Sequence, residues 1–320
     1  MKIIFVGTPQ IACETLRSVA KHHDVVAVLS QTDKPQGRSK TLIPTDVALL
    51  GESLGIKVYK SDKNSDELIN ELKNYNADIF LVFAYGVILK KSFLEITKFG
   101  GINIHPSLLP KYRGPSPIQS AILNGDTISG ITIQNIKLKV DSGDILYQKR
   151  FEIEETDDIF SIEERVSKIS SEIIIDFLND FENGKIKPIS QDEKDVVHCV
   201  MFKKEDGLIN WQENGESILN KIRAFAKWPV CFSFLKNKKL LIHKAIIETN
   251  INFDNYKGRQ NGEIVIANNK DGIILKTNNK LIKIVKLQVE GKNILEYKDF
   301  LNGYKNLAGL ILGNDIPKRF

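Results

Sequence analysis

The sequence predicts an α/β domain with a doubly wound, mostly parallel sheet, followed by a smaller antiparallel β-barrel domain. Three observations lead to this prediction. Two apolar segments, residues 2–6 and 24–29, enclose a stretch with apolar residues at helical spacing, which is the pattern of a β-α-β unit. Both segments are apolar along their whole length, as expected for parallel strands that are covered on both faces. After residue 206 the pattern changes to short alternating strands separated by turn residues, which is typical of small barrels.

The alternation of helices and strands continues along the first half of the chain, so we expect a Rossmann-like sheet there. Residues 31–44 interrupt it with a polar, basic loop, and a loop of this length is uncommon inside a compact α/β unit. The predicted elements are helices at 45–53, 65–75, 117–124 and 158–183 and strands at 56–59, 78–84, 130–136 and 145–153, with a further strand that begins at Gly101. The last helix is amphipathic, and its predicted core face consists of Ile162, Val166, Ile169, Ile173 and Phe177.

A polar stretch without strand signals separates the two predicted domains. We assign residues 1–183 to the first domain, residues 184–206 to a linker and residues 207–320 to the second domain. The second domain is predicted to be an OB-like antiparallel barrel. Its predicted strands are at 208–211, 230–235, 239–248, 262–267, 272–277 and 281–288.

The charge of the chain is distributed unevenly. The 320 residues carry a net charge of +5; residues 201–320 hold 21 Lys and Arg against 12 Asp and Glu, a net charge of +9, so residues 1–200 carry −4. A basic second half favours an anionic partner that is too large for one pocket. A solvated lysine-rich surface is the alternative explanation.

Cysteine usage and hydropathy indicate a cytoplasmic protein. Cys13, Cys199 and Cys231 are odd in number and far apart in the sequence, as expected for thiols in a reducing compartment. There is no run of 18 or more apolar residues, so no membrane contact is predicted. The short apolar run that ends at Gly7 predicts a first strand and not a signal peptide.

The strongest candidate for chemistry is a polar cluster at the end of an apolar strand. Asn103 and His105 are two residues apart, so both side chains point to one face of the strand. In open α/β sheets, ligands bind beyond the carboxyl ends of the strands. An Asn amide beside a cationic His can stabilise an oxyanion, and Asp141 in a later turn can orient the imidazole and favour its protonated form. A satisfied polar pair at a strand end is the alternative for Asn103 and His105, and simple turn chemistry is the alternative for Asp141.

The same residues exclude several classes of reaction. Gly7-Thr8-Pro9 lacks the later glycines of a dinucleotide fingerprint. The five histidines show no ligand spacing, so we predict no metal. The sequence contains no nucleophile elbow and no cysteine paired with the cluster. Acyl-type transfer between two bound substrates, with the proton moved by His105 or Asp141, fits these residues.

Two basic segments favour contacts to nucleic acid. The loop at residues 31–44 carries Lys34, Arg38 and Lys40 without aromatic residues, which suits phosphate contacts better than base stacking. A connector without a function is the alternative for this loop. Residues 221–229 interleave basic and aromatic side chains.

The motif from Asn103 to Pro110, together with Asp141-Ser142-Gly143-Asp144, closely resembles the folate-dependent formyltransferases. The resemblance implies that Asn103, His105 and Asp141 are the catalytic trio and that 10-formyltetrahydrofolate donates a formyl group to an amine. It further implies that the pterin lies against the backbone of residues 85–89 and that the loop after His105 lines the folate site. The implied folate-site residues are Tyr85, Gly86, Val87, Ile88, Leu89, Ser107, Leu108, Leu109 and Pro110.

Within this family the chain is most similar, over nearly its full length, to the members that formylate methionyl initiator tRNA. The similarity lies in Gly7-Thr8-Pro9, residues 33–40, residues 204–207 with Trp211, and residues 222–229. It implies that the second domain grips the tRNA, that the basic loop reaches the acceptor end, and that the protein acts as a monomer. The implied tRNA contacts are Lys34, Arg38, Lys40, Lys203, Lys204 and Arg223.

Three positions depart from the pattern of these members. Gln10-Ile11 stands where Asp-Phe is more common, Met201 replaces a lysine, and Asn210 replaces an Asp before Trp211. None of these departures touches the trio.

Four other assignments compete with this one. A sugar-nucleotide N-formyltransferase uses the same folate donor and can carry a small second domain, but neither the basic loop nor so basic a second half is expected in it. A glycinamide ribonucleotide formyltransferase leaves residues 207–320 unexplained. A formyltetrahydrofolate hydrolase is expected to have a regulatory domain before the first strand. An RNA-binding protein without activity has no need of an intact trio.

Overall fold

The computed structural model describes residues 1–35 and 41–313. The chain forms two compact units, which are described separately. The first unit consists of residues 1–117, 127–153 and 161–200, and the second consists of residues 118–126, 154–160 and 201–320. The predicted Arg38 and Lys40 lie outside the described residues.

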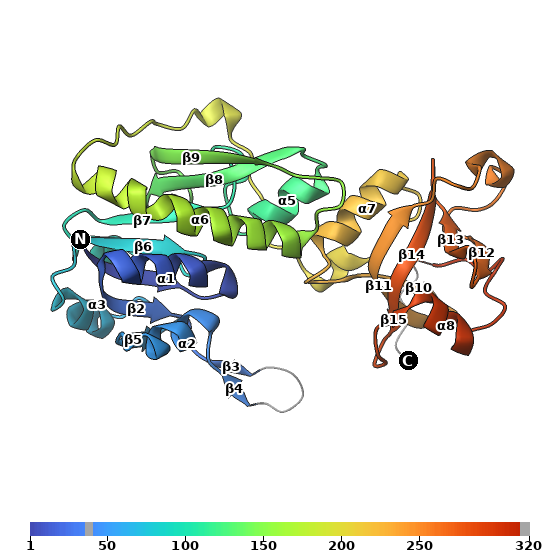
Figure 1. Ribbon diagram of the computed structural model, residues 1–320, viewed down its shortest axis with the longest axis horizontal. Coiled ribbons are helices and arrows are strands. Elements are labelled where there is room, and N and C mark those ends of the chain that lie inside the picture. The colour runs from blue at the N-terminus through green and yellow to red at the C-terminus, as the bar shows by residue number, and fades with distance from the viewer. Residues whose placement is uncertain (36–40, 314–320) are drawn as a thin grey trace. The chain divides into compact units, whose positions relative to one another are not determined.

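The first unit is built on a seven-stranded sheet (Figure 1) with the strand order β5-β2-β1-β6-β7-β8-β9. The first five strands of this order are parallel, and β8 and β9 pair antiparallel, so the predicted mostly parallel α/β fold is confirmed. The strands are β1 (Lys2–Gly7), β2 (Asp24–Ser30), β5 (Val58–Lys60), β6 (Ile79–Phe83), β7 (Gly101–His105), β8 (Ile128–Asn135) and β9 (Ile145–Glu152).

Helices cover both faces of this sheet. One core cluster contains Ile4 and Val6 of β1 with Leu72 of α3 (Asp66–Lys73) and Phe93 of α4 (Lys91–Leu94). The alternate side chains point to the other face, where Gly51 of α2 (Asp46–Ser53) packs so closely on Val28 and Val58 that a Cβ at this glycine would lie 2.9 Å from the Val58 side chain. Two helices run beside each other in Figure 1, α1 (Cys13–His22) and α6 (Ile159–Glu182), and Ser18 Oγ donates to the carbonyl of Ser171.

Two local predictions need correction. The core face of α6 includes Ile162, Val166 and Phe177 as predicted. Ile169 and Ile173 are only half-buried, and Ser170 and Ile174 are buried in their place. The reason is that the buried residues of this face follow a spacing of four, through Val166, Ser170 and Ile174. The next buried position after Ser170 is therefore Ile174, and Ile173 is left half-buried. The loop at residues 31–44 is also not without structure, because β3 (Lys34–Pro35) and β4 (Leu42–Ile43) pair antiparallel at its base.

The carboxyl ends of β1, β6 and β7 lie at one edge of the sheet. Their last residues are Gly7, Phe83 and His105, and parallel pairing keeps these ends together. The chain leaves β1 towards β2 on one side and later reaches β6 and β7 on the other, so the edge contains the topological switch point. Ligand sites of open α/β sheets lie at such points.

The second unit contains a six-stranded antiparallel sheet with the order β10-β11-β14-β13-β12, on which β15 pairs with β14. The strands are β10 (Cys231–Leu235), β11 (Lys238–Ile247), β12 (Ile264–Asn268), β13 (Gly272–Lys276), β14 (Leu281–Val289) and β15 (Leu295–Glu296). Three helices belong to the same unit: α5 (Pro117–Leu123) from residue 118 on, α7 (Gly215–Ala224) and α8 (Tyr297–Gly303).

Residues 309–313 join the two edges of this sheet. The Phe234 N–H donates to the carbonyl of Gly313 at 3.1 Å, and the Ile264 N–H donates to the carbonyl of Leu310 at 2.8 Å. Because Phe234 lies in β10 and Ile264 in β12, one short segment satisfies both edge strands, which supports the predicted barrel-like arrangement.

The strand predicted at 208–211 is absent from this sheet. Leu208 forms a single bridge to Phe232 after a 3₁₀ turn at Lys204–Gly207. Trp211 is buried and donates from Nε1 to Ser233 Oγ, so its burial and not a strand pattern explains the apolar residues here.

Candidate active site

The site is organised by the pairing of β7 with β8. Asn103 lies opposite Gln134, and His105 lies opposite Thr132. Residues opposite each other on antiparallel strands point to the same face of the sheet, so all four side chains gather on one side. Gln134 and Thr132 are buried polar residues that the sequence analysis missed. The available signal was the alternation of the polar Thr132 and Gln134 with the apolar Ile131 and Ile133.

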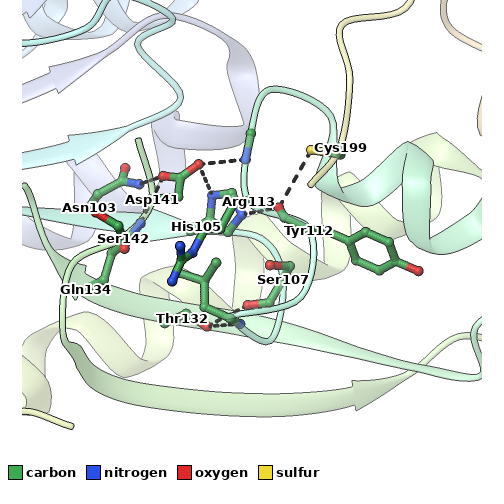
Figure 2. A network of polar contacts seen from close by, with 12 residues as sticks. Asn103, His105, Ser107, Tyr112, Arg113, Thr132, Gln134, Asp141, Ser142 and Cys199 are labelled. Carbon is green, nitrogen blue, oxygen red and sulfur yellow. Dashed lines mark hydrogen bonds and ion pairs between the residues drawn. The ribbon is translucent and has the colours of Figure 1, made fainter. Parts of the chain in front are cut away.

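The carboxylate of Asp141 is the centre of the cluster (Figure 2). Its Oδ1 accepts from Gln134 Nε2 at 2.9 Å and from Asn103 Nδ2 at 3.4 Å, and its Oδ2 accepts from the backbone N–H of Gly114 at 2.9 Å. His105 Nδ1 lies 3.6 Å from the same Oδ2. The structure therefore brings together the three residues that the sequence predicted as the trio.

The hydrogen bonds of His105 restrict which nitrogen faces the cluster. Nε2 lies 2.9 Å from the carbonyl oxygen of Tyr112, and a carbonyl can only accept, so Nε2 carries a proton. Nδ1 therefore meets the carboxylate of Asp141 with a lone pair or, in the imidazolium, with a second N–H. Only the imidazolium makes this contact attractive. The ring is 4% exposed, so little water competes for these contacts.

The turn that presents Asp141 has an uncommon backbone. Asp141 has a φ of 50°, which non-glycine residues rarely adopt. At Gly143 an added Cβ would lie 1.6 Å from the carbonyl oxygen of Asn135, so only glycine fits. Ser142 Oγ donates to the carbonyl of Lys139 at 2.8 Å and closes the turn.

The loop after His105 is held from within by Thr132. The Thr132 hydroxyl donates to the carbonyl of Ser107 at 2.6 Å and accepts from the N–H of Leu109 at 3.0 Å. Gln148 Nε2 donates to the carbonyl of Leu109 and to Thr132 Oγ1, each at 2.9 Å. Leu108 packs on Gly130, where a Cβ would lie 2.4 Å from its Cδ2. The loop predicted to line the folate site is thus rigidly placed beside the trio.

The predicted folate-site residues differ in what they expose. The side chains of Tyr85, Leu89, Ser107 and Leu109 are buried, whereas Ile88 is 68% exposed. The Tyr85 hydroxyl donates to the carbonyl of Ser61, and burial raises the pKa of this phenol above its ordinary value. Residues 85–89 can therefore offer a ligand mainly their backbone and the side chain of Ile88. Val87, Leu108 and Pro110 are half-buried, and Gly86 is exposed.

The predicted tRNA contacts have different environments. Lys34 is exposed in β3, and Lys203 and Lys204 are exposed at the 3₁₀ turn of the second unit. Arg223 is half-buried. Its Nη1 donates to the carbonyls of Glu154 and Asp157 at 3.1 and 2.8 Å, and its Nη2 donates to Asn220. The guanidinium of Arg223 thus has structural partners within its own unit.

Residues 1–35 and 41–313 lack two features, a metal-ligand cluster and a membrane-spanning helix. In that part of the chain, no group of three or more His, Cys, Asp or Glu side chains could hold a metal ion. The same described ranges contain no helix whose length and apolar character would let it cross a bilayer.

Two family models match the chain. The family model described as formyl transferase matches residues 1–178. The family model of the formyl transferase C-terminal domain matches residues 201–305. The chain belongs to the formyl transferase family. The family resemblance that the motifs indicated is confirmed, and the chain is an enzyme of this type.

Curated relatives extend this family assignment over the whole chain. The chain is 40% identical to the methionyl-tRNA formyltransferase of Borreliella afzelii (strain PKo), over 98% of each protein. It is 37% identical to the methionyl-tRNA formyltransferase of Geobacter metallireducens, over 98% of this chain and 99% of the relative.

A solved structure shares the fold at lower identity. It is the N-formyltransferase from Helicobacter canadensis, solved with folinic acid and dTDP-3-aminofucose. The TM-score is 0.65 at 20% identity, with 89% of this chain and 99% of that chain covered. This likeness shows a common fold and carries no argument about the acceptor.

Proposed function

We propose that this formyl transferase moves the formyl group of 10-formyltetrahydrofolate to the amino group of methionyl initiator tRNA and thereby makes N-formylmethionyl-tRNA for translation initiation. The names of the relatives that match it end to end support this acceptor. The observation that carries the chemistry is the convergence of Asn103 Nδ2 and His105 Nδ1 on the Asp141 carboxylate.

The donors of the site suit the intermediate of formyl transfer. Attack of the amine on the formyl carbon turns the carbonyl oxygen into an oxyanion. Asn103 supplies an amide donor, and His105 supplies Nδ1–H, since its Nε2–H is engaged by Tyr112. Donation from Nδ1 requires the imidazolium, whose Nδ1 lies 3.6 Å from Oδ2 of Asp141. Pre-positioned donors of this kind are worth roughly 3 kcal/mol each.

Formyl transfer requires that one proton move from the amine to the folate, and this defines the role of His105 and Asp141. A bond forms between the methionyl nitrogen and the formyl carbon, and the bond from that carbon to N10 of the folate breaks. The amine loses a proton and N10 gains one. His105 and Asp141 lie in contact and can hold that proton between the two steps as a coupled pair.

The residues beside the trio fit a flat folate ring. Residues 84–89 have left-handed backbone at Ala84 and Gly86, and Ile88 presents an exposed apolar side chain next to this backbone. We propose that the pterin lies on this segment and that Leu108 and Pro110, in the loop held by Thr132, line the opposite side. The buried Ser107, Leu109, Tyr85 and Leu89 hold the shape of the two segments.

The basic surface is the proposed binding partner for the tRNA. Lys203 and Lys204 in the second unit and Lys34 in the first are exposed and can neutralise phosphates. Arg223 instead donates to backbone carbonyls, so we assign it a supporting role. We further propose that the enzyme acts as a monomer in the cytoplasm, where its three cysteines stay free as the structure has them.

One assay tests the acceptor directly. The purified protein is supplied with 10-formyltetrahydrofolate and one of three amines: methionyl initiator tRNA, methionyl elongator tRNA or a dTDP-amino sugar. Formylation of the methionyl residue is measured by mass spectrometry, and release of tetrahydrofolate is measured by absorbance. We expect transfer to the initiator tRNA. Transfer to the amino sugar alone would make the protein a sugar-nucleotide N-formyltransferase and refute the proposal.

A further inference from the structure

We infer that Gln191 is a positioning residue for the Asp141 turn and that the segment carrying it, residues 189–199, is a structural part of the active site. This segment is called the strap below. The expected effect on formyl transfer rests on the proposed function. The expected effect on the structure of the turn does not.

Gln191 holds the backbone of the catalytic turn. Its Nε2 donates to the carbonyl of Asp141 at 2.9 Å and to the carbonyl of Gly143 at 2.7 Å. An amide nitrogen has two hydrogens, so both carbonyls are satisfied by one side chain. The Oε1 accepts from Arg113 Nε at 2.9 Å, which leaves no ambiguity about the orientation of the amide.

The turn needs such an anchor because its backbone is strained. Asp141 has its φ in the left-handed region, which is strained for a non-glycine residue and persists only where surrounding contacts impose it. The side chain of Asp141 is held by Gln134 and Gly114. The backbone carbonyl of Asp141 is held by Gln191. Gln191 therefore sets the position of the Asp141 carboxylate relative to His105.

The strap is itself fixed on both sides of the site. The N–H of Ile145 donates to the carbonyl of Ile189 at 2.7 Å, and the return bond is 2.9 Å. The N–H of Arg113 donates to the carbonyl of Val197 at 2.9 Å, and the N–H of Cys199 donates to the carbonyl of Arg113 at 2.8 Å. The strap thus connects the Asp141 turn with the loop that supplies the N–H of Gly114.

A charged clamp completes the connection. The fully buried Arg113 places Nη1 2.9 Å from Oε1 of Glu193 in the strap, and Lys139 Nζ lies 3.0 Å from Oε2 of the same carboxylate. Lys139 and Arg113 both lower the pKa of Glu193. Lys139 is two residues before Asp141, so the clamp and Gln191 hold the turn at two points.

The test replaces only the donors of Gln191. In Gln191→Glu the oxygen that faces Arg113 remains, but the two carbonyls lose their donors and meet a carboxylate oxygen. Gln191→Met removes the donors without adding charge. If Gln191→Glu does not unfold cooperatively, Gln191→Met alone decides whether Gln191 positions the turn. Gln212→Glu is the matched control, since Gln212 is exposed in the second unit and only accepts from Asn261 Nδ2.

Two readouts separate positioning from general stability. We expect kcat for formyl transfer to fall on the order of 10- to 100-fold in both Gln191 variants, with KM for both substrates changed by less than about threefold, because misplacement by about 1 Å is enough for such a loss. Amide hydrogen exchange in peptides covering residues 136–146 should accelerate in both variants and stay unchanged in Gln212→Glu.

The result that overturns the inference is a folded Gln191→Met variant with wild-type exchange in this turn. Wild-type kcat in that variant overturns it too. An enzyme that formylates no tRNA refutes the proposed function instead, and the exchange measurement still decides the role of Gln191.

Discussion

Nδ1 of His105 lies 3.6 Å from Oδ2 of Asp141, while Nε2 of the same ring is engaged by the carbonyl of Tyr112 at 2.9 Å. The two contacts together leave Nδ1 as the only nitrogen of the ring that can serve an oxyanion. They also place the Asp141 carboxylate beside that nitrogen. The first three of the four predictions that follow test this geometry and its supports, and the fourth concerns a buried thiol of the second unit.

Asp141→Asn should lower kcat for formyl transfer by on the order of 10²–10⁴, because the neutral amide neither stabilises the imidazolium nor shares its proton. Single-turnover kinetics with 10-formyltetrahydrofolate and methionyl initiator tRNA measure the effect. Asp144→Asn is the control in the same turn, since Asp144 is paired with Lys137 and Ser190 at the surface. Equal losses in both variants would argue against a special role for Asp141.

Gly143→Ala should abolish the geometry of the catalytic turn, since the added Cβ would lie 1.6 Å from the carbonyl oxygen of Asn135. We expect kcat to fall by about 10²-fold or more as the carboxylate of Asp141 is displaced. The control is Gly258→Ala, where an added Cβ meets nothing within 4 Å. A Gly143→Ala variant with the activity of this control would show that the turn can relax without consequence.

Thr132→Val should destabilise the protein and loosen the loop that lines the folate site. The valine leaves the N–H of Leu109 and the carbonyl of Ser107 without the partner that the hydroxyl supplies, at a cost of about 1–3 kcal/mol for each buried group. Urea unfolding should show the loss, and KM for 10-formyltetrahydrofolate should rise. Thr127→Val, at an exposed position, is expected to change neither quantity.

The stability of the fold should decrease at alkaline pH through Cys231. Burial raises the pKa of this thiol from 9.0 to about 12. Above pH 9 the unfolded chain loses a proton that the folded chain keeps, so the free energy of unfolding falls as the pH rises from about 9 to about 12, by up to about 1.4 kcal/mol per pH unit. Below pH 9 this thiol contributes no pH dependence.

Denaturant unfolding at several pH values, compared between wild type and Cys231→Ala, measures this contribution. The variant should show a shallower decline between pH 9 and the highest pH at which both proteins remain folded. Parallel declines in the two proteins would contradict the assignment.

The sequence was sufficient to predict the fold class and to single out Asn103, His105 and Asp141, which the structure brings together. Continuous apolar strands alternating with helices predict a parallel sheet, because each strand must be buried on both faces. The spacing of two between Asn103 and His105 places both on one face of a strand, since strand periodicity is a local property. The folate donor came from the resemblance to a family, and comparison over the whole chain confirmed that family.

The supporting residues were not readable from the sequence. Gln134 and Thr132 join the site only because β8 pairs with β7 in one register, and Gln148 joins because β9 follows. Likewise, the prediction of a polar linker did not show that residues 189–199 return to hydrogen-bond with the catalytic loop and turn.

The sequence by itself therefore determined three features: the pairing of Asn103 with His105, the apolar strands and the basic second half. Periodicity and charge are properties of neighbouring residues, so they can be read from the sequence. The tertiary structure alone decided which nitrogen of His105 faces Asp141, that Arg223 serves its own unit, and that Gln191 anchors the turn. Each of these depends on contacts between residues distant in the chain, and such contacts are set by strand register and packing, which no local pattern encodes.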